Sequence, residues 1–166
     1  MSDPTDTDRT EHANVARVRA AAAALGLAID VRRFPEGTRT ALDAATAIGC
    51  PVGAIVKSLI FTVDGEVVLA LVSGANQLDE AKLASAAGGS TCRRASADEV
   101  RAATGFPIGG VPPIGLATPV REFLDDNLLE HDIVWAAAGT WHDVFPIAPT
   151  VLAAVSGGWV GDLRRI

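Results

Sequence analysis

A lysine interrupts an apolar segment that is typical of a β-strand. Lys57 lies at the centre of GAIVKSLIFTV, residues 53–63, and the chain contains one other lysine, Lys82. Because an unpaired ammonium is costly to bury, a lysine at this place indicates a cleft that holds a negative or strongly polar group. Two structural explanations compete with this one. The side chain could reach solvent from an edge strand, or its charge could keep that edge from pairing with other chains.

A second segment combines glycine and proline in a way that suits ligand binding. Residues 109–115 have the sequence GGVPPIG. Glycine lets a backbone approach a ligand closely and proline fixes the backbone in advance, so N–H groups here could bind a carbonyl or an oxyanion without reorganising. A tight connection between a helix and a strand would use the same residues. The segment lacks the Gly-Lys-Ser/Thr of a P-loop, and it does not match a dinucleotide-binding fingerprint.

The elements that must position these segments alternate irregularly along the chain. The glycine, proline and capping signals predict helices at residues 11–25, 41–48, 76–87, 96–105 and 149–157, and strands at 28–34, 53–63, 67–72, 133–138 and 144–147. Asp64-Gly65 predicts a tight hairpin turn between the second and third strands. One clear hairpin among irregularly alternating elements predicts a mixed α/β sheet, not a regular doubly wound fold.

Composition limits the class of protein. The 166 residues are 49% hydrophobic and 20% charged, which predicts one globular domain, residues 13–166, after a disordered acidic leader, residues 1–12. No apolar run is long enough to cross a membrane and the start does not resemble a signal peptide, so we expect a cytoplasmic protein without a membrane partner. The net charge of −6 excludes a basic surface that coats nucleic acid. Cys50 and Cys92 lack zinc-ligand spacing and do not make a disulfide framework.

Four motifs in order carry a resemblance to a known family. They are Thr38-Arg39-Thr40-Ala41-x-x-Ala44-Ala45, Ile55-Val56-Lys57-Ser58-Leu59, residues 109–115, and Ala137-Ala138-Gly139. Together they resemble the YbaK/EbsC family, which includes the editing domain of some bacterial prolyl-tRNA synthetases. The resemblance covers about residues 15–158. It implies a curved, barrel-like mixed sheet with helices around it, and a deacylase that hydrolyses the ester between a wrong amino acid and the tRNA 3′ end and uses no metal and no cofactor.

The resemblance also implies roles for residues. Lys57 matches the family's essential lysine, and Gly109 and Gly110 begin its Gly-x-x-x-Pro loop, whose backbone holds the substrate. We therefore expect Lys57 to bind the terminal phosphate or the ester carbonyl, and the two glycine amides to orient the aminoacyl group. Further candidates for substrate binding are Thr40, Ser58, Val111, Pro112, Pro113, Gly115, Gly139 and His142.

Several of these positions keep a structural explanation. Thr40 could simply cap a helix, and His142 could be an exposed loop residue instead of a substrate contact or proton shuttle. Ser58 stands where alanyl-specific members have asparagine. Ala137 and Val144 stand where cysteinyl-specific members have a serine and an acid, so neither specificity transfers.

The sequence predicts a trans-editing aminoacyl-tRNA deacylase whose partner is the tRNA 3′ end. A synthetase or an elongation factor could recruit it. Two alternatives remain: a non-catalytic module that binds a nucleotide or an aminoacyl ligand, and a protein-interaction domain with a regulatory role.

Overall fold

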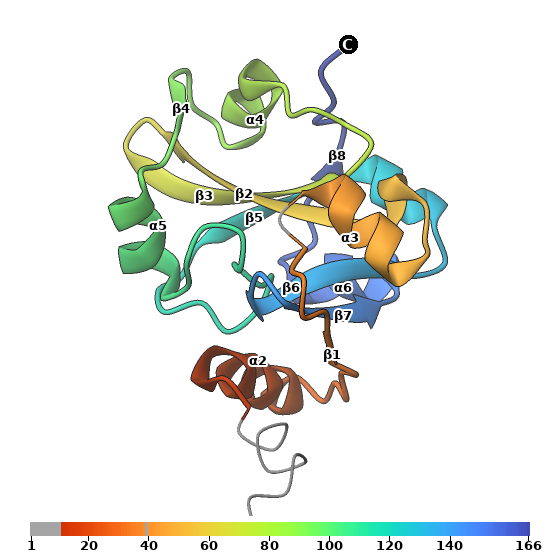
Figure 1. Cartoon of the computed structure of the whole chain (residues 1–166). Coiled ribbons are helices and arrows are strands. Elements are labelled where there is room, and N and C mark those ends of the chain that lie inside the picture. The colour runs from red at the N-terminus through yellow and green to blue at the C-terminus, as the bar shows by residue number, and fades with distance from the viewer. Residues whose placement is uncertain (1–10, 39) are drawn as a thin grey trace, which may run out of the picture.

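The structure of the chain, a computed structural model, describes residues 11–38 and 40–166. Its strands form two stacked sheets, a larger one with the order β4-β2-β3-β5-β8 and a smaller one with the order β1-β7-β6 (Figure 1). The larger sheet contains β2 (Val56–Val63), β3 (Glu66–Ser73), β4 (Cys92–Arg94), β5 (Arg121–Asp125) and β8 (Val160–Gly161). The smaller contains β1 (Arg32–Arg33), β6 (Val134–Thr140) and β7 (Asp143–Ile147). The larger sheet is mixed, because β3 pairs antiparallel with β2 and parallel with β5.

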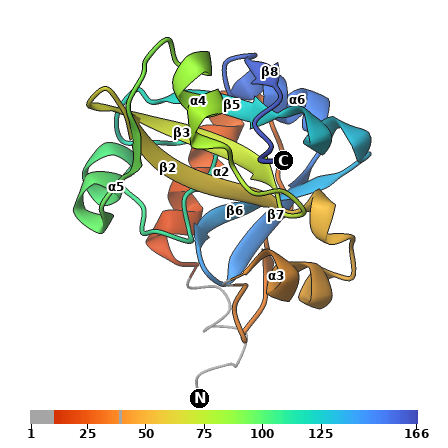
Figure 2. The ribbon, with the colours of Figure 1, turned by 90° about the horizontal axis from the view of Figure 1, so that it is seen from above.

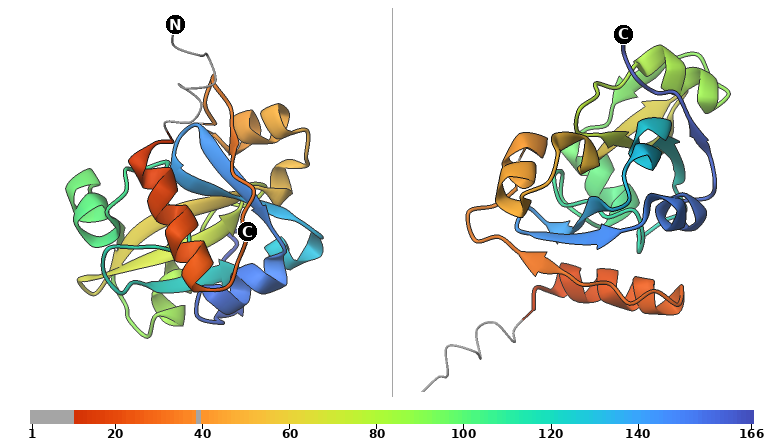
Figure 3. Two further views of the ribbon diagram at one scale, coloured as in Figure 1. Left: turned by 90° about the horizontal axis from the view of Figure 1, so that it is seen from below. Right: turned by 90° about the vertical axis from the view of Figure 1, so that its right-hand side faces the viewer.

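Helices surround the two sheets. They are α2 (Ala13–Ala24), α3 (Ala41–Ile48), α4 (Glu80–Ala86), α5 (Ala97–Thr104) and α6 (Pro149–Val155), with 3₁₀ turns η1 (Val52–Ala54) and η2 (Asp126–Glu130). Helix α2 lies across the smaller sheet, as the view from below shows (Figure 3). Helix α4 lies over the larger sheet on the opposite side of the molecule (Figure 2). Among the described residues, no helix is both long and apolar enough to cross a membrane.

Both faces of the β2–β3 hairpin are buried. Ile60, Leu69 and Leu71 pack in a core between the two sheets, which α2 completes with Val18 and Ala22. Alternate residues of the same strands, among them Phe61 and Val68, pack in a second core under α4. Successive side chains of a strand point to opposite faces, so the nearly continuous apolar sequence of this hairpin follows from its place between two layers.

The predicted hairpin turn is confirmed. Asp64 and Gly65 have φ angles of 49° and 85°, and Val63 pairs with Glu66 across the turn. A two-residue turn of this kind needs positive φ at both positions, which aspartate and glycine tolerate better than other residues. The turn fixes the β2–β3 register, in which Lys57 is opposite Val72.

The mixed α/β class is confirmed, and the barrel-like expectation is refined. The strands belong to two separate sheets that do not close into a barrel. An isolated parallel bridge between Ile55 and Trp135 connects them. The strand predicted at residues 28–34 is shorter in the structure, where Arg32 and Arg33 form β1 and pair with β7. The predicted leader lies outside the described residues except for Glu11 and His12, and the His12 ring accepts a hydrogen bond from the Asn14 N–H at the start of α2.

Candidate active site

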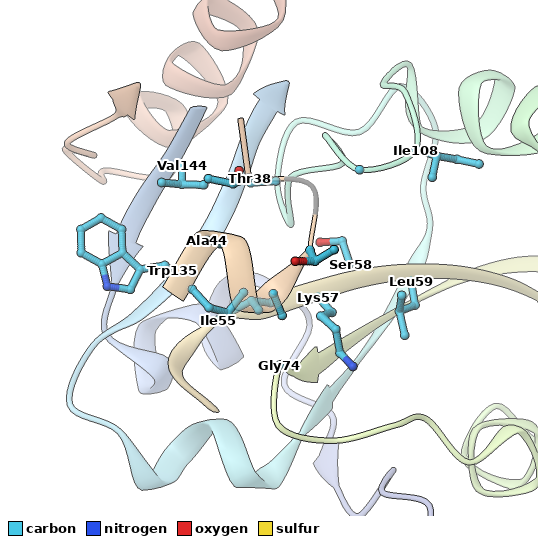
Figure 4. A pocket seen from close by; sticks show the side chains of 15 residues that line it. Thr38, Ala44, Ile55, Lys57, Ser58, Leu59, Gly74, Ile108, Trp135 and Val144 are labelled. Carbon is cyan, nitrogen blue, oxygen red and sulfur yellow. The ribbon is translucent and has the colours of Figure 1, made fainter. Parts of the chain in front are cut away.

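A cavity of about 430 Å³ lies at the amino-terminal end of β2. Its walls come from four segments far apart in the sequence: β2, α3, the β6–β7 pair, and the loop at Ile108 and Gly109 (Figure 4). Ile55, Trp135 and Val144 form an apolar wall that also packs against α3. The stacking of the two sheets therefore creates the cavity, because each sheet supplies one side of it.

Lys57 lines this cavity and is half-buried. Its ammonium donates a hydrogen bond to the Asn76 carbonyl oxygen, just beyond the end of β3. Burial lowers the pKa of Lys57, and the negative charge of Asp125 partly offsets that effect. An ammonium has three N–H donors, so the bond to Asn76 leaves two for other acceptors. The cavity lies beside Lys57, and the ammonium points toward the end of β3 at Gly74 (Figure 4).

Ser58 lies next to Lys57 and points to the other side of β2 (Figure 4). Its hydroxyl oxygen is buried and has no hydrogen-bond partner. A buried polar group without a partner costs about 1–3 kcal/mol, and such groups are rare in native proteins. Ser58 also lines the cavity, so its hydroxyl lies in that wall without a hydrogen bond to the protein.

Thr40 both caps α3 and lines the cavity. Its side-chain oxygen accepts a hydrogen bond from the Asp43 N–H at 3.0 Å and so caps α3. The same residue lines the cavity, together with Thr38. The cap fixes the first turn of α3, which holds Ala41 and Ala44 against the cavity.

The glycine-proline loop contributes to the cavity through its first part. Gly109 lines the cavity and has a φ of +87°. The Gly110 N–H donates to the Pro107 carbonyl oxygen at 3.0 Å, so this amide is engaged within the loop. Trp141 holds the loop in place, because its indole N–H donates to the Ile108 carbonyl oxygen at 2.8 Å.

The remaining loop residues turn away from the cavity. Val111 is 1% exposed and packs in the core between the sheets, and Pro112 beside it is buried. Pro113 and Gly115 line a different hollow, of about 250 Å³, on the other side of the loop. These four candidates therefore support the loop from behind and lie outside the cavity wall.

Gly139 and His142 lie in a neighbouring hollow of about 280 Å³. One ring nitrogen of His142, Nδ1, lies 3.1 Å from the Phe34 carbonyl oxygen, and its main-chain N–H donates to the Thr140 hydroxyl at 3.0 Å. These contacts hold His142 beside the cavity, on the far side of the β6–β7 turn. The structure thus brings Thr40, Lys57, Ser58 and Gly109 together and places His142 next to them.

The sequence did not single out several residues of the site. Asn76 and Asp125 surround the Lys57 ammonium, and Trp135 forms part of the apolar wall. Asp125 ends an apolar strand in the sequence FLDD, which could have suggested a buried acid. The specificity positions of the resemblance, Ala137 and Val144, do line the cavity. Within residues 11–38 and 40–166, no three His, Cys, Asp or Glu side chains gather as a metal site would require.

Comparisons with known proteins agree with the resemblance. A family model described as an aminoacyl-tRNA editing domain matches residues 35–155. The proline–tRNA ligase of Nitratidesulfovibrio vulgaris (strain Hildenborough) is 36% identical over 164 residues, which is 97% of this chain and 27% of the ligase. YwhH of Bacillus subtilis, an uncharacterized protein, is 32% identical over 127 residues, 76% of this chain and 81% of YwhH.

One solved structure is similar over nearly the whole chain. It is the crystal structure of a candidate trans-editing enzyme for prolyl-tRNA synthetase, with a TM-score of 0.89 and 43% identity, and the match covers 95% of this chain and 100% of that one. The present chain spans about a quarter of the length of the ligase relative.

Proposed function

The chain belongs to the aminoacyl-tRNA editing domain family, and we propose that it removes wrongly attached amino acids from tRNA in trans. The reaction is hydrolysis of the ester between the amino acid and the 3′-terminal ribose. Water adds to the carbonyl carbon, the bond to the ribose oxygen breaks, and that oxygen takes up the proton that the water loses. The observation that carries the proposal is a cavity with a half-buried lysine on its wall, in a chain of this family.

The cavity offers the groups that this reaction needs. The Lys57 ammonium is a half-buried cation, which can stabilise the oxyanion that develops on the ester carbonyl or hold the terminal phosphate. Gly109 presents its backbone to the same cavity. In this proposal the protein positions water and stabilises charge without a metal, and the neighbouring ribose hydroxyl of the tRNA assists the attack.

The lining favours an amino acid with an uncharged side chain. Among the described residues that line the cavity, Lys57 is the one ionisable group, and the wall opposite it is apolar. A positively charged side chain would lose its hydration there and face the Lys57 cation, and a carboxylate would compete with the ester carbonyl or the terminal phosphate for the same ammonium. We propose that the substrate is a small uncharged amino acid. Discrimination by one methylene is worth about 1–3 kcal/mol, so which one it is requires measurement.

The partner we propose is the aminoacylated 3′ end of tRNA in the cytoplasm. The overall charge is negative, and phosphate contacts dominate the affinity of proteins for nucleic acids. Binding limited to the 3′ end of the tRNA would therefore be weak. Recruitment by a synthetase or an elongation factor would raise the local concentration of substrate.

A panel of mischarged tRNAs tests the function. Alanine, serine, cysteine, threonine and proline are attached to tRNAs of several identities, and release of the amino acid is followed with wild-type protein. Rapid release of one uncharged class is the expected result. If no member is released, the non-catalytic binding module becomes the better description, and a salt-sensitive affinity for uncharged tRNA would then distinguish a nucleic-acid module from a protein-interaction domain.

Ser58→Ala should separate activity from stability. The substitution removes a buried hydroxyl without a partner, so the free energy of unfolding should stay constant or rise by up to about 1 kcal/mol. Deacylation should fall about tenfold, because the substrate loses a hydrogen bond. Urea unfolding and the kcat/KM of deacylation are the two measurements.

Ser156→Ala is the matched control for Ser58→Ala. Ser156 is a buried serine whose hydroxyl donates to the Ala153 carbonyl oxygen at 3.2 Å, far from the cavity. This variant should lose stability and keep activity. A Ser58→Ala protein that loses stability while keeping full activity would contradict the assignment.

Gly109→Ala should damage the loop. Gly109 has a φ of +87°, and a Cβ there would lie 2.6 Å from the Trp141 indole nitrogen. The left-handed conformation costs about 1–2 kcal/mol, and displacing Trp141 breaks its bond to Ile108. We expect at least about a tenfold loss in kcat for deacylation, because small misplacements in a site are costly.

Gly157→Ala introduces a similar backbone strain without a steric clash. Its φ is +102° and nothing lies within 4 Å of the added Cβ. This variant should lose comparable stability and keep its activity. Equal losses of activity in the two variants would show that general destabilisation, and not the loop, accounts for the effect.

A further inference from the structure

Asp125 is a buried carboxylate beside Lys57. It ends β5 and is 0% exposed. One of its oxygens, Oδ2, accepts hydrogen bonds from the Ser73 N–H at 3.1 Å and from the Asn76 side-chain amide at 2.8 Å. The other, Oδ1, accepts from the Asn127 N–H at 3.1 Å. All three donors are neutral amides.

Asn76 connects this carboxylate to the lysine. Its side chain binds Asp125, and its main-chain carbonyl accepts the hydrogen bond from the Lys57 ammonium. The same side-chain amide also donates to the Asn127 side-chain oxygen at 2.8 Å. Asn76 is further held by a turn, since its N–H donates to the Ser73 carbonyl oxygen at 2.9 Å. The carbonyl that receives Lys57 is thus fixed from three directions.

Both oxygens of Asp125 accept N–H donors, which a carboxylate can do and the single oxygen of an asparagine amide cannot. A buried carboxylate is costly unless a positive charge compensates it. Lys57 interacts electrostatically with Asp125 and supplies a compensating positive charge. The other charged or titratable groups on the elements packed around this turn include Asp126 and Glu130 of η2, His131 after it, and Arg165, whose N–H donates to the Gln77 carbonyl oxygen.

We propose that Asp125 and Asn76 are positioning residues that fix the place and the charge of the Lys57 ammonium at the cavity. Asp125 orders Asn76 and supplies the opposite charge, and Asn76 aims the ammonium through its carbonyl. The proposal rests on the proposed function for its effect on catalysis. Its electrostatic part concerns the folded protein alone and can be measured without substrate.

The two lysines of this chain make a direct test possible. In protein labelled with ¹³C,¹⁵N-lysine, the side-chain signals belong to Lys57 and Lys82, and a Lys57→Arg variant assigns them. Lys82 pairs with Asp162 at 2.7 Å on another surface and serves as an internal reference. In Asp125→Asn the pKa of Lys57 should fall, because the charge that raises it is gone, while the signal of Lys82 should be the same in both proteins.

Deacylation should follow the same titration. Where Lys57 must be charged, activity is lost as the pH rises through its pKa, so the alkaline limb of the pH–rate profile should move to lower pH in Asp125→Asn. Asn76→Ala keeps the buried charge and removes one amide contact of Asp125, and its kcat/KM should fall about ten- to a hundredfold. The half-exposed position of Asn76 keeps this variant foldable if Asp125→Asn does not fold.

Glu130→Gln is the control, because it removes a carboxylate near this turn that contacts Asn127. It should leave the Lys57 titration unchanged. A folded Asp125→Asn protein with an unaltered Lys57 pKa would overturn the proposal, and so would a folded Asn76→Ala protein with wild-type kcat/KM and an unaltered Lys57 signal. Wild-type protein that hydrolyses no member of the tRNA panel would instead refute the proposed function, and the lysine titration would still decide on the positioning.

Discussion

Lys57→Ala is expected to reduce deacylation of the preferred mischarged tRNA by about 100- to 1,000-fold, the usual effect of removing a group that stabilises a developing oxyanion. The cavity has no other ionisable group among its described lining residues, so nothing nearby would replace the ammonium. Single-turnover deacylation with excess protein measures the loss. Alanine also removes the cation that faces Asp125, so a moderate fall in thermal stability should accompany it.

The kinetic parameters distinguish the two roles considered for Lys57. If the ammonium stabilises the ester carbonyl in the transition state, kcat falls and KM changes little. If it holds the terminal phosphate equally in substrate and transition state, KM rises and kcat is kept. Lys57→Arg keeps the charge but has a larger, planar head group, so it should recover part of the phosphate role and little of the carbonyl role.

Lys82→Ala is the natural control for this substitution. Lys82 is the other lysine of the chain, and its ammonium is bonded to Asp162 and to the Arg164 carbonyl oxygen near the carboxyl terminus. Its removal should leave deacylation unchanged. Full activity in a folded Lys57→Ala protein would refute the catalytic assignment of Lys57, although another residue of the cavity could still carry the reaction.

Local signals in the sequence predicted the parts of the site that depend on local structure. The Asp64-Gly65 turn determines the register of β2, and that register places Lys57. Thr40 caps α3 as its residue type suggests. The capping box at Ser96 is present, with Glu99 as its second member. In each case, residues within a few positions of one another carry the whole interaction, so a single sequence suffices to predict it.

The parts of the fold and of the site that we did not predict depend on contacts between segments far apart in the sequence. Strand β4 has three residues and β8 has two, and their existence depends on distant partner strands. Strand β5 was missed although it lies inside the larger sheet, between β3 and β8, and Asp125 was missed with it. The apolar wall around Trp135 joins residues of three segments. The periodicity of a single segment does not indicate contacts between distant segments.

The loop at residues 109–115 shows a different limit. Its composition predicted a rigid loop, and residues 106–115 contain no helix or strand. Composition does not tell which face of a rigid loop meets a ligand. Gly109 lines the cavity, whereas Val111 is buried in the core because an apolar side chain gains more there than in a polar site.

The second large effect concerns stability and arises at the back of this loop. Glu122 on β5 lines the hollow that Pro113 and Gly115 also border. One of its carboxyl oxygens is buried without a hydrogen-bond partner. Burial raises the pKa of Glu122 to about 9, so the carboxyl is neutral at pH 7 in the folded protein.

This shift makes the protein less stable as the pH rises. The pKa of Glu122 is higher in the folded state than the ordinary value of 4.5, so the folded state binds the proton more tightly. The resulting stabilisation is complete below about pH 4.5 and is lost progressively up to about pH 9. Each pH unit within this range costs about 1.4 kcal/mol, so about 3 kcal/mol is lost by pH 7.

Glu122→Gln should remove this dependence. Glutamine has nearly the same shape and cannot ionise, so the free energy of unfolding at pH 7 should exceed that of the wild type by up to about 3 kcal/mol, with little difference at pH 4.5. Urea unfolding at pH 4.5, 7 and 8.5 measures the effect.

Glu66→Gln is the control, because the exposed Glu66 pairs with Arg121 and has a lowered pKa. Its removal should not stabilise the protein at any of these pH values. Parallel pH dependences of wild type and Glu122→Gln would mean that the carboxyl finds a partner or water in solution. A stabilised variant with unchanged deacylation would show that this acid serves neither the fold nor the cavity at neutral pH, whereas a loss of activity would connect Glu122 to the loop that carries Gly109.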